Sequence, residues 1–186
     1  MSRSVAFRPA GEADAPRVRA LYLATPGYFE VLSIPVPSET EVRTELRTAA
    51  ADDRRRTELI VANDDPGLPE EPYDAELDGW PIGYLDVTLD YLEPGDATVN
   101  LVLIRGDLQG RGYGGAVMRA FEARMRGRVR RILASIYGRN PHARRFWRSL
   151  GYAFAIDAAP VLEWYAKELA PASVRATAAG TAAGEA

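Results

Sequence analysis

The sequence has no cysteine and only one histidine, His142. The absence of cysteine excludes disulfides, thiolate metal sites and a cysteine nucleophile. A single histidine excludes multi-histidine zinc sites, and it leaves a serine–histidine pair with only one partner. We therefore expect no bound metal, and much of the usual catalytic chemistry is missing from the chain.

Long apolar runs are also missing. The 186 residues contain no uninterrupted apolar stretch of about 18 residues, the length needed to span a membrane. Residues 1–5 lack the apolar stretch of an export signal. We therefore expect a cytoplasmic protein with no membrane partner.

The composition is typical of a globular protein. Hydrophobic residues make up 47% of the chain and charged residues 26%, which is enough for a sizeable core. The length suits one domain, predicted over residues 1–170. Residues 171–186 consist mostly of Ala, Gly and Thr and are expected to form a flexible tail.

Charge is distributed unevenly along the chain. Residues 1–100 hold 9 basic and 20 acidic side chains, whereas residues 101–150 hold 12 arginines against Asp107 and Glu122. Such a basic block could bind nucleic acid, a phosphorylated cofactor or only solvent. Aromatic residues are not interleaved with the arginines as a stacking platform would need, so we expect no nucleic-acid partner.

Residues 63–78 form the acidic counterpart of that block. They include seven acidic residues and three prolines, which predicts a long surface loop. Such a loop either keeps the protein soluble or draws in a cationic substrate.

Hydrophobic periodicity predicts an α/β fold with the element order β-α-α-β-β-β-α-β-α-β-β. This order describes a mixed central sheet flanked by helices on both faces. In residues 81–91, large apolar residues alternate with Asp86, Thr88 and Asp90, which predicts a strand with one wet face. The expected strands are residues 5–8, 57–62, 81–91, 97–104, 132–137, 152–156 and 161–167, and the expected helices are residues 12–23, 38–52, 116–126 and 140–150.

A glycine-rich loop, residues 109–115, lies between a strand and a helix. Glycines at such a turn let a phosphate approach backbone N–H groups beside the positive end of the helix dipole. Gly110, Gly112 and Gly115 also satisfy the GxGxxG pattern of dinucleotide-binding folds. Five residues separate these glycines from the strand, and the acidic residue expected about 20 positions later is missing. Both facts argue against a dinucleotide site.

Two linked motifs give the sequence a family resemblance. Gln109, Gly112 and Gly114 match Gln/Arg-x-x-Gly-x-Gly/Ala, and Asn140, Ala143, Phe146 and Trp147 match N-x-x-A-x-x-[F/L]-[Y/W]. With these motifs and its element order, the chain resembles the GNAT superfamily of N-acetyltransferases, which use acetyl-coenzyme A. The resemblance extends over roughly residues 5–168.

The resemblance implies a set of cofactor contacts. Backbone amides of the glycine-rich loop would hold the pyrophosphate, the end of the preceding strand would bind the pantetheine arm, and the second motif would line the opposite wall. Several arginines are candidates for the outlying phosphate, namely Arg111, Arg139, Arg144 and Arg145. The implied cofactor-binding residues are Leu103, Ile104, Arg105, Gln109, Gly110, Arg111, Gly112, Tyr113, Gly114, Gly115, Asn140, Phe146 and Trp147.

The sequence departs from the family pattern at two catalytic positions. Trp147 stands where many members have a tyrosine that protonates the thiolate, and Thr98 stands where many have a glutamate base. A hairpin would place Asp86, Thr88 and Asp90 on the same face as Thr98 and Asn100. We therefore hypothesise that Asp86 or Asp90 accepts the proton of the amine; the alternative is a strand face that is merely polar.

The resemblance also places an acceptor pocket beside residues 25–29. Tyr28 and Phe29, together with Asn100, are the predicted substrate-binding residues, although aromatic anchoring of the loop would explain the first two equally well. The predicted function is transfer of an acetyl group to an amine of a small molecule or peptide. The alternative is a catalytically weak domain that binds or senses acyl-coenzyme A, and the sequence leaves assembly into a homodimer open.

Overall fold

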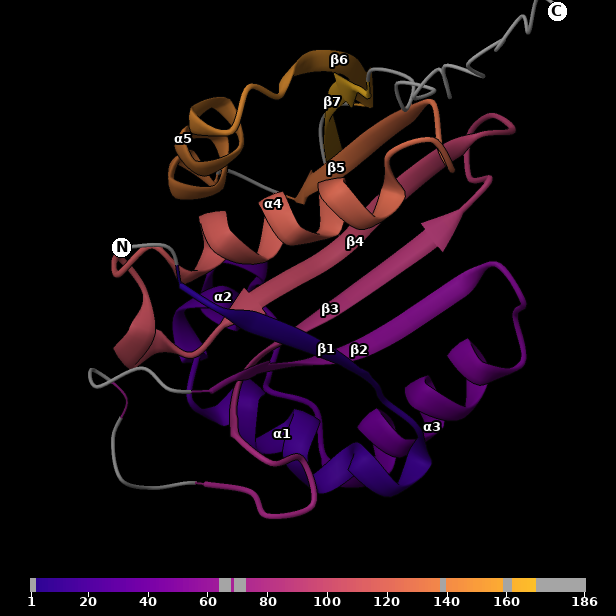
Figure 1. Cartoon of the computed structure of the whole chain (residues 1–186). Coiled ribbons are helices and arrows are strands. Elements are labelled where there is room, and N and C mark those ends of the chain that lie inside the picture. The colour runs from indigo at the N-terminus through magenta and orange to yellow at the C-terminus, as the bar shows by residue number, and fades with distance from the viewer. Residues whose placement is uncertain (1–2, 64–67, 69–72, 138–139, 159–161, 170–186) are drawn as a thin grey trace, which may run out of the picture.

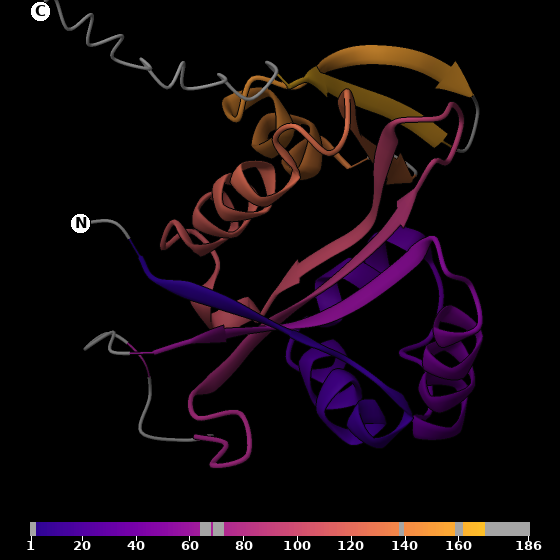
Figure 2. The ribbon, with the colours of Figure 1, turned by 45° about the vertical axis from the view of Figure 1, so that its right-hand side comes forward.

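The computed structural model describes residues 3–63, 68, 73–137, 140–158 and 162–169. Figures 1 and 2 show one twisted sheet with helices on both faces. Its seven strands lie in the order β1-β2-β3-β4-β5-β7-β6, and β4 and β5 form the parallel pair among antiparallel neighbours. The predicted mixed α/β fold is confirmed.

The elements follow the predicted order, with one added α-helix and one added short 3-10 helix. The strands are β1 (Val5–Pro9), β2 (Arg55–Ala62), β3 (Trp80–Leu89), β4 (Asp96–Ile104), β5 (Arg131–Tyr137), β6 (Ala153–Ala158) and β7 (Leu162–Glu168). The helices are η1 (Glu12–Asp14), α1 (Ala15–Leu23), α2 (Pro26–Leu32), α3 (Glu39–Ala50), η2 (Gly106–Leu108), α4 (Tyr113–Met125) and α5 (Pro141–Ser149). The predicted tail lies outside the described residues.

Local capping signals fix the start of α3. The Ser38 hydroxyl accepts a hydrogen bond from the Glu41 N–H at 3.3 Å, and the Glu41 carboxylate accepts one from the Ser38 N–H at 2.7 Å. These hydrogen bonds lower the pKa of Glu41, with the bond to the Ser38 side chain as the largest cause. The reciprocal cap satisfies two N–H groups that the helix cannot bond internally.

Helix α2 was not predicted. Pro26 and Gly27 suggest a break in the chain, but proline fits the first turn of a helix because its missing N–H has no helical partner there. Ser33 ends the helix with a φ of 56°. The chain between α1 and α3 is therefore partly helical.

The sheet buries both of its faces. On one face, Val87 and Val99 pack against Val117 and Phe121 of α4. On the other, residues such as Leu59 pack under α1 and α3. The predicted wet face of β3 is wrong, because Asp86 is 2% and Thr88 9% exposed. Polar side chains from neighbouring strands, described below, compensate for their burial.

The single lysine joins three elements on the α4 face. The Lys167 ammonium on β7 donates to the Glu122 carboxylate of α4 at 2.7 Å and to the Leu150 carbonyl after α5 at 2.9 Å. Glu122 is only 5% exposed. Its charge is therefore neutralised by Lys167 inside the core.

Arg17 of α1 ties down the described end of the acidic segment. Its guanidinium bonds Asp74 at 2.6 Å, Asp14 at 2.9 Å and also Glu76. The hydrogen bond from Arg17 is the largest cause of a lowered pKa at Asp74. Two carboxylates of the acidic segment, Asp74 and Glu76, are therefore paired with Arg17. Residues 64–67 and 69–72 lie outside the described chain.

We expect Arg17→Met to lower the free energy of unfolding by about 1–2 kcal/mol at neutral pH, because it leaves charged acceptors without their donor. Asp74 has a lowered pKa in the folded state, so its contribution is present above its ordinary pKa and is lost as the pH falls through the lowered value. The difference between variant and parent should shrink below about pH 4. Urea unfolding of parent and variant at pH 7 and pH 3 measures this difference in unfolding free energy.

Arg47→Met is the control, because Arg47 lies 3.9 Å from Glu12 and both side chains are exposed. Its effect should stay within about 0.5 kcal/mol at either pH. A penalty for Arg17→Met that is the same at pH 3 as at pH 7 would rule out the charge of Asp74 as its origin.

Candidate functional site

A groove opens where the parallel strands β4 and β5 separate. Their pairing joins Asp96–Val99 of β4 to residues 131–134 of β5 and ends there. Beyond that point, residues 100–104 of β4 and residues 135–137 of β5 line a groove of about 840 Å³. Past Val99, the edge of β4 therefore has N–H and C=O groups that the backbone of β5 does not bond.

A bulge in β4 lies at the start of this separation. Val87 pairs with Val99 but Asp86 pairs with Leu101, so Asn100 is an extra residue. Its side-chain amide donates to Asp86 at 3.0 Å and to Thr88 at 2.8 Å. Because a bulge increases the local bend and twist of a strand, it helps to turn β4 away from β5.

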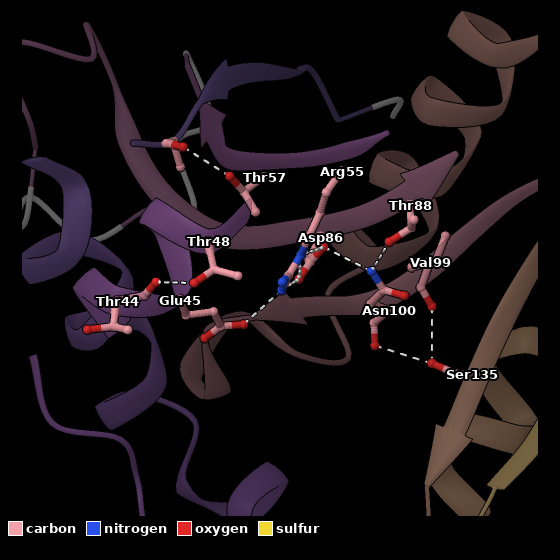
Figure 3. Close-up of polar contacts among 11 residues, drawn as sticks. Thr44, Glu45, Thr48, Arg55, Thr57, Asp86, Thr88, Val99, Asn100 and Ser135 are labelled. Carbon is pink, nitrogen blue, oxygen red and sulfur yellow. Dashed lines mark hydrogen bonds and ion pairs between the residues drawn. The ribbon is translucent and has the colours of Figure 1, made fainter. Parts of the chain in front are cut away.

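Ser135 of β5 holds the bulge from the other side. Its hydroxyl lies 3.3 Å from the Val99 carbonyl and 3.3 Å from the Asn100 carbonyl. Figure 3 shows Asn100 between Asp86 and Thr88 on one side and Ser135 on the other. The bulge is thus fixed by side chains of both neighbouring strands.

The glycine-rich loop forms one end of the groove. Gly110 and Gly112 have φ values of 74° and 88°, a region where glycine carries no penalty. The Gln109 amide donates to the Ile104 carbonyl at 2.9 Å and so anchors the loop to the end of β4. With Gly112 as the N-cap of α4, the loop and the first turn of the helix form an anion-binding geometry.

Helix α5 forms the wall opposite this loop. The Asn140 side chain accepts a hydrogen bond from the Ala143 N–H at 2.9 Å, as predicted for a helix that begins with Pro141. A Cβ at Gly114 would lie 3.0 Å from the Phe146 ring. Glycine at this position therefore lets α4 approach α5 closely.

Most of the predicted cofactor-binding residues line the groove, but three do not. Arg105 pairs with Asp107 at 3.0 Å. Arg111 is exposed on the loop, where its carbonyl accepts from Arg3, and the Tyr113 ring is buried beneath Arg3. Their backbones remain candidate contacts, and the exposed side chain of Arg111 remains a candidate for the outlying phosphate. The lining residues are Leu103, Ile104, Gln109, Gly110, Gly112, Gly114, Gly115, Asn140, Phe146 and Trp147.

Tyr28 and Phe29 have different environments. Tyr28 lines the groove, and burial is the main cause that raises its pKa to about 12. Phe29 is 4% exposed and packs against Tyr22 with ring centroids 5.1 Å apart. The prediction that Phe29 faces the acceptor is therefore wrong, because its position on α2 turns the ring into the core.

Asp86 lies behind the groove wall instead of lining it. Its carboxylate, 3% exposed, accepts from Asn100 and from the Arg55 guanidinium of β2. Arg55 also bonds Glu45 of α3 at 3.0 Å, as Figure 3 shows. The hydrogen bond to Asp86 raises the pKa of Arg55, and burial raises the pKa of Glu45 against the opposing effect of Arg55.

Asp90 is not on the predicted strand face. Strand β3 ends at Leu89, and Asp90 has a φ of 51°. Its exposed carboxylate accepts from the Gly95 N–H at 2.7 Å and closes the turn to β4. Asp90 therefore stabilises the hairpin, at the opposite end of β4 from the glycine-rich loop.

Thr98 faces Thr88 across the hairpin, as the alternation predicts. Its side chain is fully buried, and its hydroxyl has no hydrogen-bond partner within the described chain. Thr98 also does not line the groove. Thr98 is therefore not a candidate for contact with a ligand in the groove.

Several arginines of residues 101–150 are used in ion pairs. Arg124 pairs with Glu58, Arg131 with Asp96 at 2.6 Å and Arg144 with Glu163 at 2.6 Å. Arg119 lines the groove beside the glycine-rich loop, and Arg145 contacts His142 at 3.0 Å. Part of the basic block is thus structural, and Arg139 lies outside the described residues.

Several residues that hold the site together were not predicted from the sequence. Arg55 and Glu45 come from β2 and α3, while Ser135 and Tyr137 come from β5. The alternation of polar residues along β5 could have indicated Ser135 and Tyr137. Nothing near Arg55 in the sequence links it to Asp86, which is 31 positions away.

A family model described as the acetyltransferase (GNAT) family matches residues 31–152. The chain belongs to this family. The structure of an acetyltransferase from Thermus thermophilus is 33% identical and has a TM-score of 0.78, over 90% of this chain and 99% of that one. This GNAT protein is therefore an N-acetyltransferase that uses acetyl-coenzyme A as its acyl donor.

Two further solved structures share the fold at low identity. Aminoglycoside acetyltransferase AAC(6')-Ib in complex with coenzyme A is 17% identical, with a TM-score of 0.68 over 89% of this chain and 95% of that one. An acetyl transferase from Salmonella typhimurium that modifies the N-terminal serine of ribosomal protein L7/L12 is 15% identical, with a TM-score of 0.70 over 90% and 96%. No curated protein matches the sequence.

The groove of this GNAT chain suits the acyl donor. It combines left-handed glycines, a helix N-terminus and an unpaired strand edge in a single continuous channel. In the described parts of the chain, no helix is both long and apolar enough to cross a bilayer.

Proposed function

We propose that this N-acetyltransferase moves an acetyl group onto a primary amine of a small molecule or peptide. The observation that carries the proposal is the groove that starts at the bulge of β4 and ends at the glycine-rich loop. Its lining includes residues of α2, of the β4 bulge and of the glycine-rich loop, so a donor and an acceptor bound in it would meet near the bulge.

The donor would lie along the loop half of the groove. Backbone N–H groups of residues 110–115 would hold its pyrophosphate, and the free edge of β4 at Leu103 and Ile104 would hydrogen-bond the pantetheine arm. Phe146 and Trp147 would cover the arm from α5. When bound, acetyl-coenzyme A supplies an acetyl group already activated as a thioester.

Asn100 is placed to orient the acceptor amine. Both hydrogens of its side-chain amide are used, because Nδ2 donates to Asp86 and Thr88. An ionised aspartate can only accept, so Asp86 forces the nitrogen of Asn100 toward itself. The Oδ1 atom of Asn100 is left to accept an N–H of the amine, which directs the lone pair on nitrogen toward the donor.

Asp86 therefore serves as a positioning residue in our proposal and not as the base. Its oxygens are occupied by Arg55 and Asn100, and no carboxylate is among the described residues that line the groove. The proton of the amine would pass to water in the groove. Trp147 cannot protonate the leaving thiolate, whereas the phenols of Tyr28 and Tyr137 line the groove and can donate.

The test combines binding and turnover. We expect acetyl-coenzyme A to raise the unfolding temperature and a panel of primary amines to cause release of free thiol. The matching N,N-dimethylated amines, which have no N–H to lose, should release none. Thermal stabilisation without thiol release from any amine would contradict transfer and favour a domain that only binds acyl-coenzyme A.

A further inference from the structure

We infer that the acceptor is a primary amine that carries a single positive charge and an apolar group beside the amine. The inference rests on the proposed function, because it concerns the acceptor half of the same groove. Its basis is the chemistry of the groove-lining residues from α2, the β4 bulge and the end of β5, which we call the acceptor half: Gly27, Tyr28, Val31, Leu32, Asn100 and Tyr137.

The acceptor half has an apolar rim. Val31 of α2 is 41% exposed and Tyr137 at the end of β5 is 44% exposed, and both line the groove. Large apolar side chains left in contact with water at a binding groove indicate a ligand that covers them. An aliphatic or aromatic group beside the reacting amine would do so.

The charges behind this half balance to one negative charge. Asp86 and Glu45 each contribute one negative charge, and Arg55, which bonds both, contributes one positive charge. One net negative charge behind Asn100 favours the approach of one ammonium group. Among the described lining residues, Arg119 is the one with an arginine or lysine side chain, and it lies beside Gly115 of the glycine-rich loop.

A polycationic acceptor would find too few partners in this groove. Each additional ammonium group must lose water on entry, and without a facing carboxylate that loss is not compensated. Among the described residues, none with a carboxylate lines the groove. The site therefore selects against polyamines and aminoglycosides, because the described lining offers no carboxylate to their additional ammonium groups.

The groove also limits the size of the acceptor. Its volume of about 840 Å³ must hold the pantetheine arm as well as the acceptor. An apolar group such as a leucine or phenylalanine side chain would cover Val31 and Tyr137 in the acceptor half. A small arylalkylamine and the N-terminus of a peptide that begins with Leu or Phe share this chemistry.

The experiment compares kcat/KM for two sets of acceptors, with thiol release as the readout. The first set is phenethylamine, isoamylamine and short peptides that begin with Phe or Leu; the second is spermidine and kanamycin. We expect the first set to exceed the second by about tenfold or more, the range that pocket contacts with one apolar group provide. Comparing the free amines with the peptides of the first set then shows whether the acceptor is a small amine or a peptide N-terminus.

Matched variants test the cause of the preference. Val31→Asp places a carboxylate in the acceptor half and should reverse the preference toward spermidine. Leu23→Asp is the control, because Leu23 is 50% exposed on α1 and does not line the groove. It should leave the preference unchanged.

A binding measurement separates failure of the proposed function from failure of the inference about the acceptor. Calorimetric titration of phenethylamine and spermidine in the presence of coenzyme A reports acceptor preference even without turnover. If no amine releases thiol but phenethylamine still binds more tightly, the proposed function fails and the inference about the acceptor stands. Equal or tighter binding of spermidine, or faster turnover of it, would overturn the inference.

Discussion

Gly112→Ala is expected to weaken the binding of acetyl-coenzyme A by about tenfold or more, a loss of about 1.4 kcal/mol. Gly112 has a φ of 88° at the start of α4. Alanine in this left-handed region costs about 1–2 kcal/mol. Either the loop keeps its shape under strain or it relaxes and turns its N–H groups away from the pyrophosphate.

Thermal unfolding measures this effect. At 100 times its dissociation constant, acetyl-coenzyme A should stabilise the parent by about 2.7 kcal/mol. For a chain of this length that free energy corresponds to a rise of about 5–10 °C in Tm. At the same concentration, Gly112→Ala should show about half of that rise or less.

Gly95→Ala is the matched control for backbone strain. Gly95 has a φ of 84° in the turn between β3 and β4, and an added Cβ would meet Arg130 at 3.8 Å, an ordinary contact distance. The variant should lose a similar amount of stability yet keep the full rise in Tm with acetyl-coenzyme A. If both variants responded alike to the ligand, the loop would not be its binding site.

Arg55→Met is expected to cost about 3–5 kcal/mol of stability, because it leaves the buried carboxylate of Asp86 without its cation. Asp86 is 2% exposed and would keep only Asn100 as a described hydrogen-bond donor. Chemical denaturation of parent and variant at neutral pH measures the loss. Adding Asp86→Asn removes the uncompensated charge and should recover a large part of it.

Arg43→Met supplies the comparison for an exposed ion pair. Arg43 bonds Glu39 at 2.7 Å on the surface of α3, with side chains 41% and 48% exposed. Its loss should be about 0.3–0.5 kcal/mol. A cost for Arg55→Met as small as this would show that the buried network contributes little to the fold.

The double variant also tests the role assigned to Asp86. With asparagine at position 86, either end of the Asn100 amide can face it, so the orientation of Asn100 is no longer fixed. We expect turnover to fall about tenfold with an unchanged pH profile. A loss of about 10²–10⁴-fold with a flattened profile is the signature of a general base, and it would return that role to Asp86.

Local signals in the sequence predict most of the elements. The Ser38–Glu41 capping box and the Asn140–Pro141 pair mark helix starts that the structure confirms. Alternation along β3 correctly places Asp86 and Thr88 on one face. These features depend on neighbours in the chain, and so they can be read without the fold.

Features that depend on distant residues could not be predicted. The bulge at Asn100 has no sequence signature of its own, because the side chains that hold it come from β3 and β5. The burial of the β3 polar face depends on α3 and Arg55, which lie elsewhere in the sequence. Asp90 was misplaced because the strand ends at Leu89, two residues earlier than predicted.

The single lysine has a practical consequence for an enzyme that handles activated acetyl groups. An amine needs a free lone pair to attack a thioester, and the Nζ atom of Lys167 is engaged within the fold by Glu122 and the Leu150 carbonyl. No second lysine side chain exists to react in its place. Lysine self-modification should therefore be negligible during long incubations, so that mass spectrometry of acetylated products can be interpreted without a background from the catalyst's own side chains.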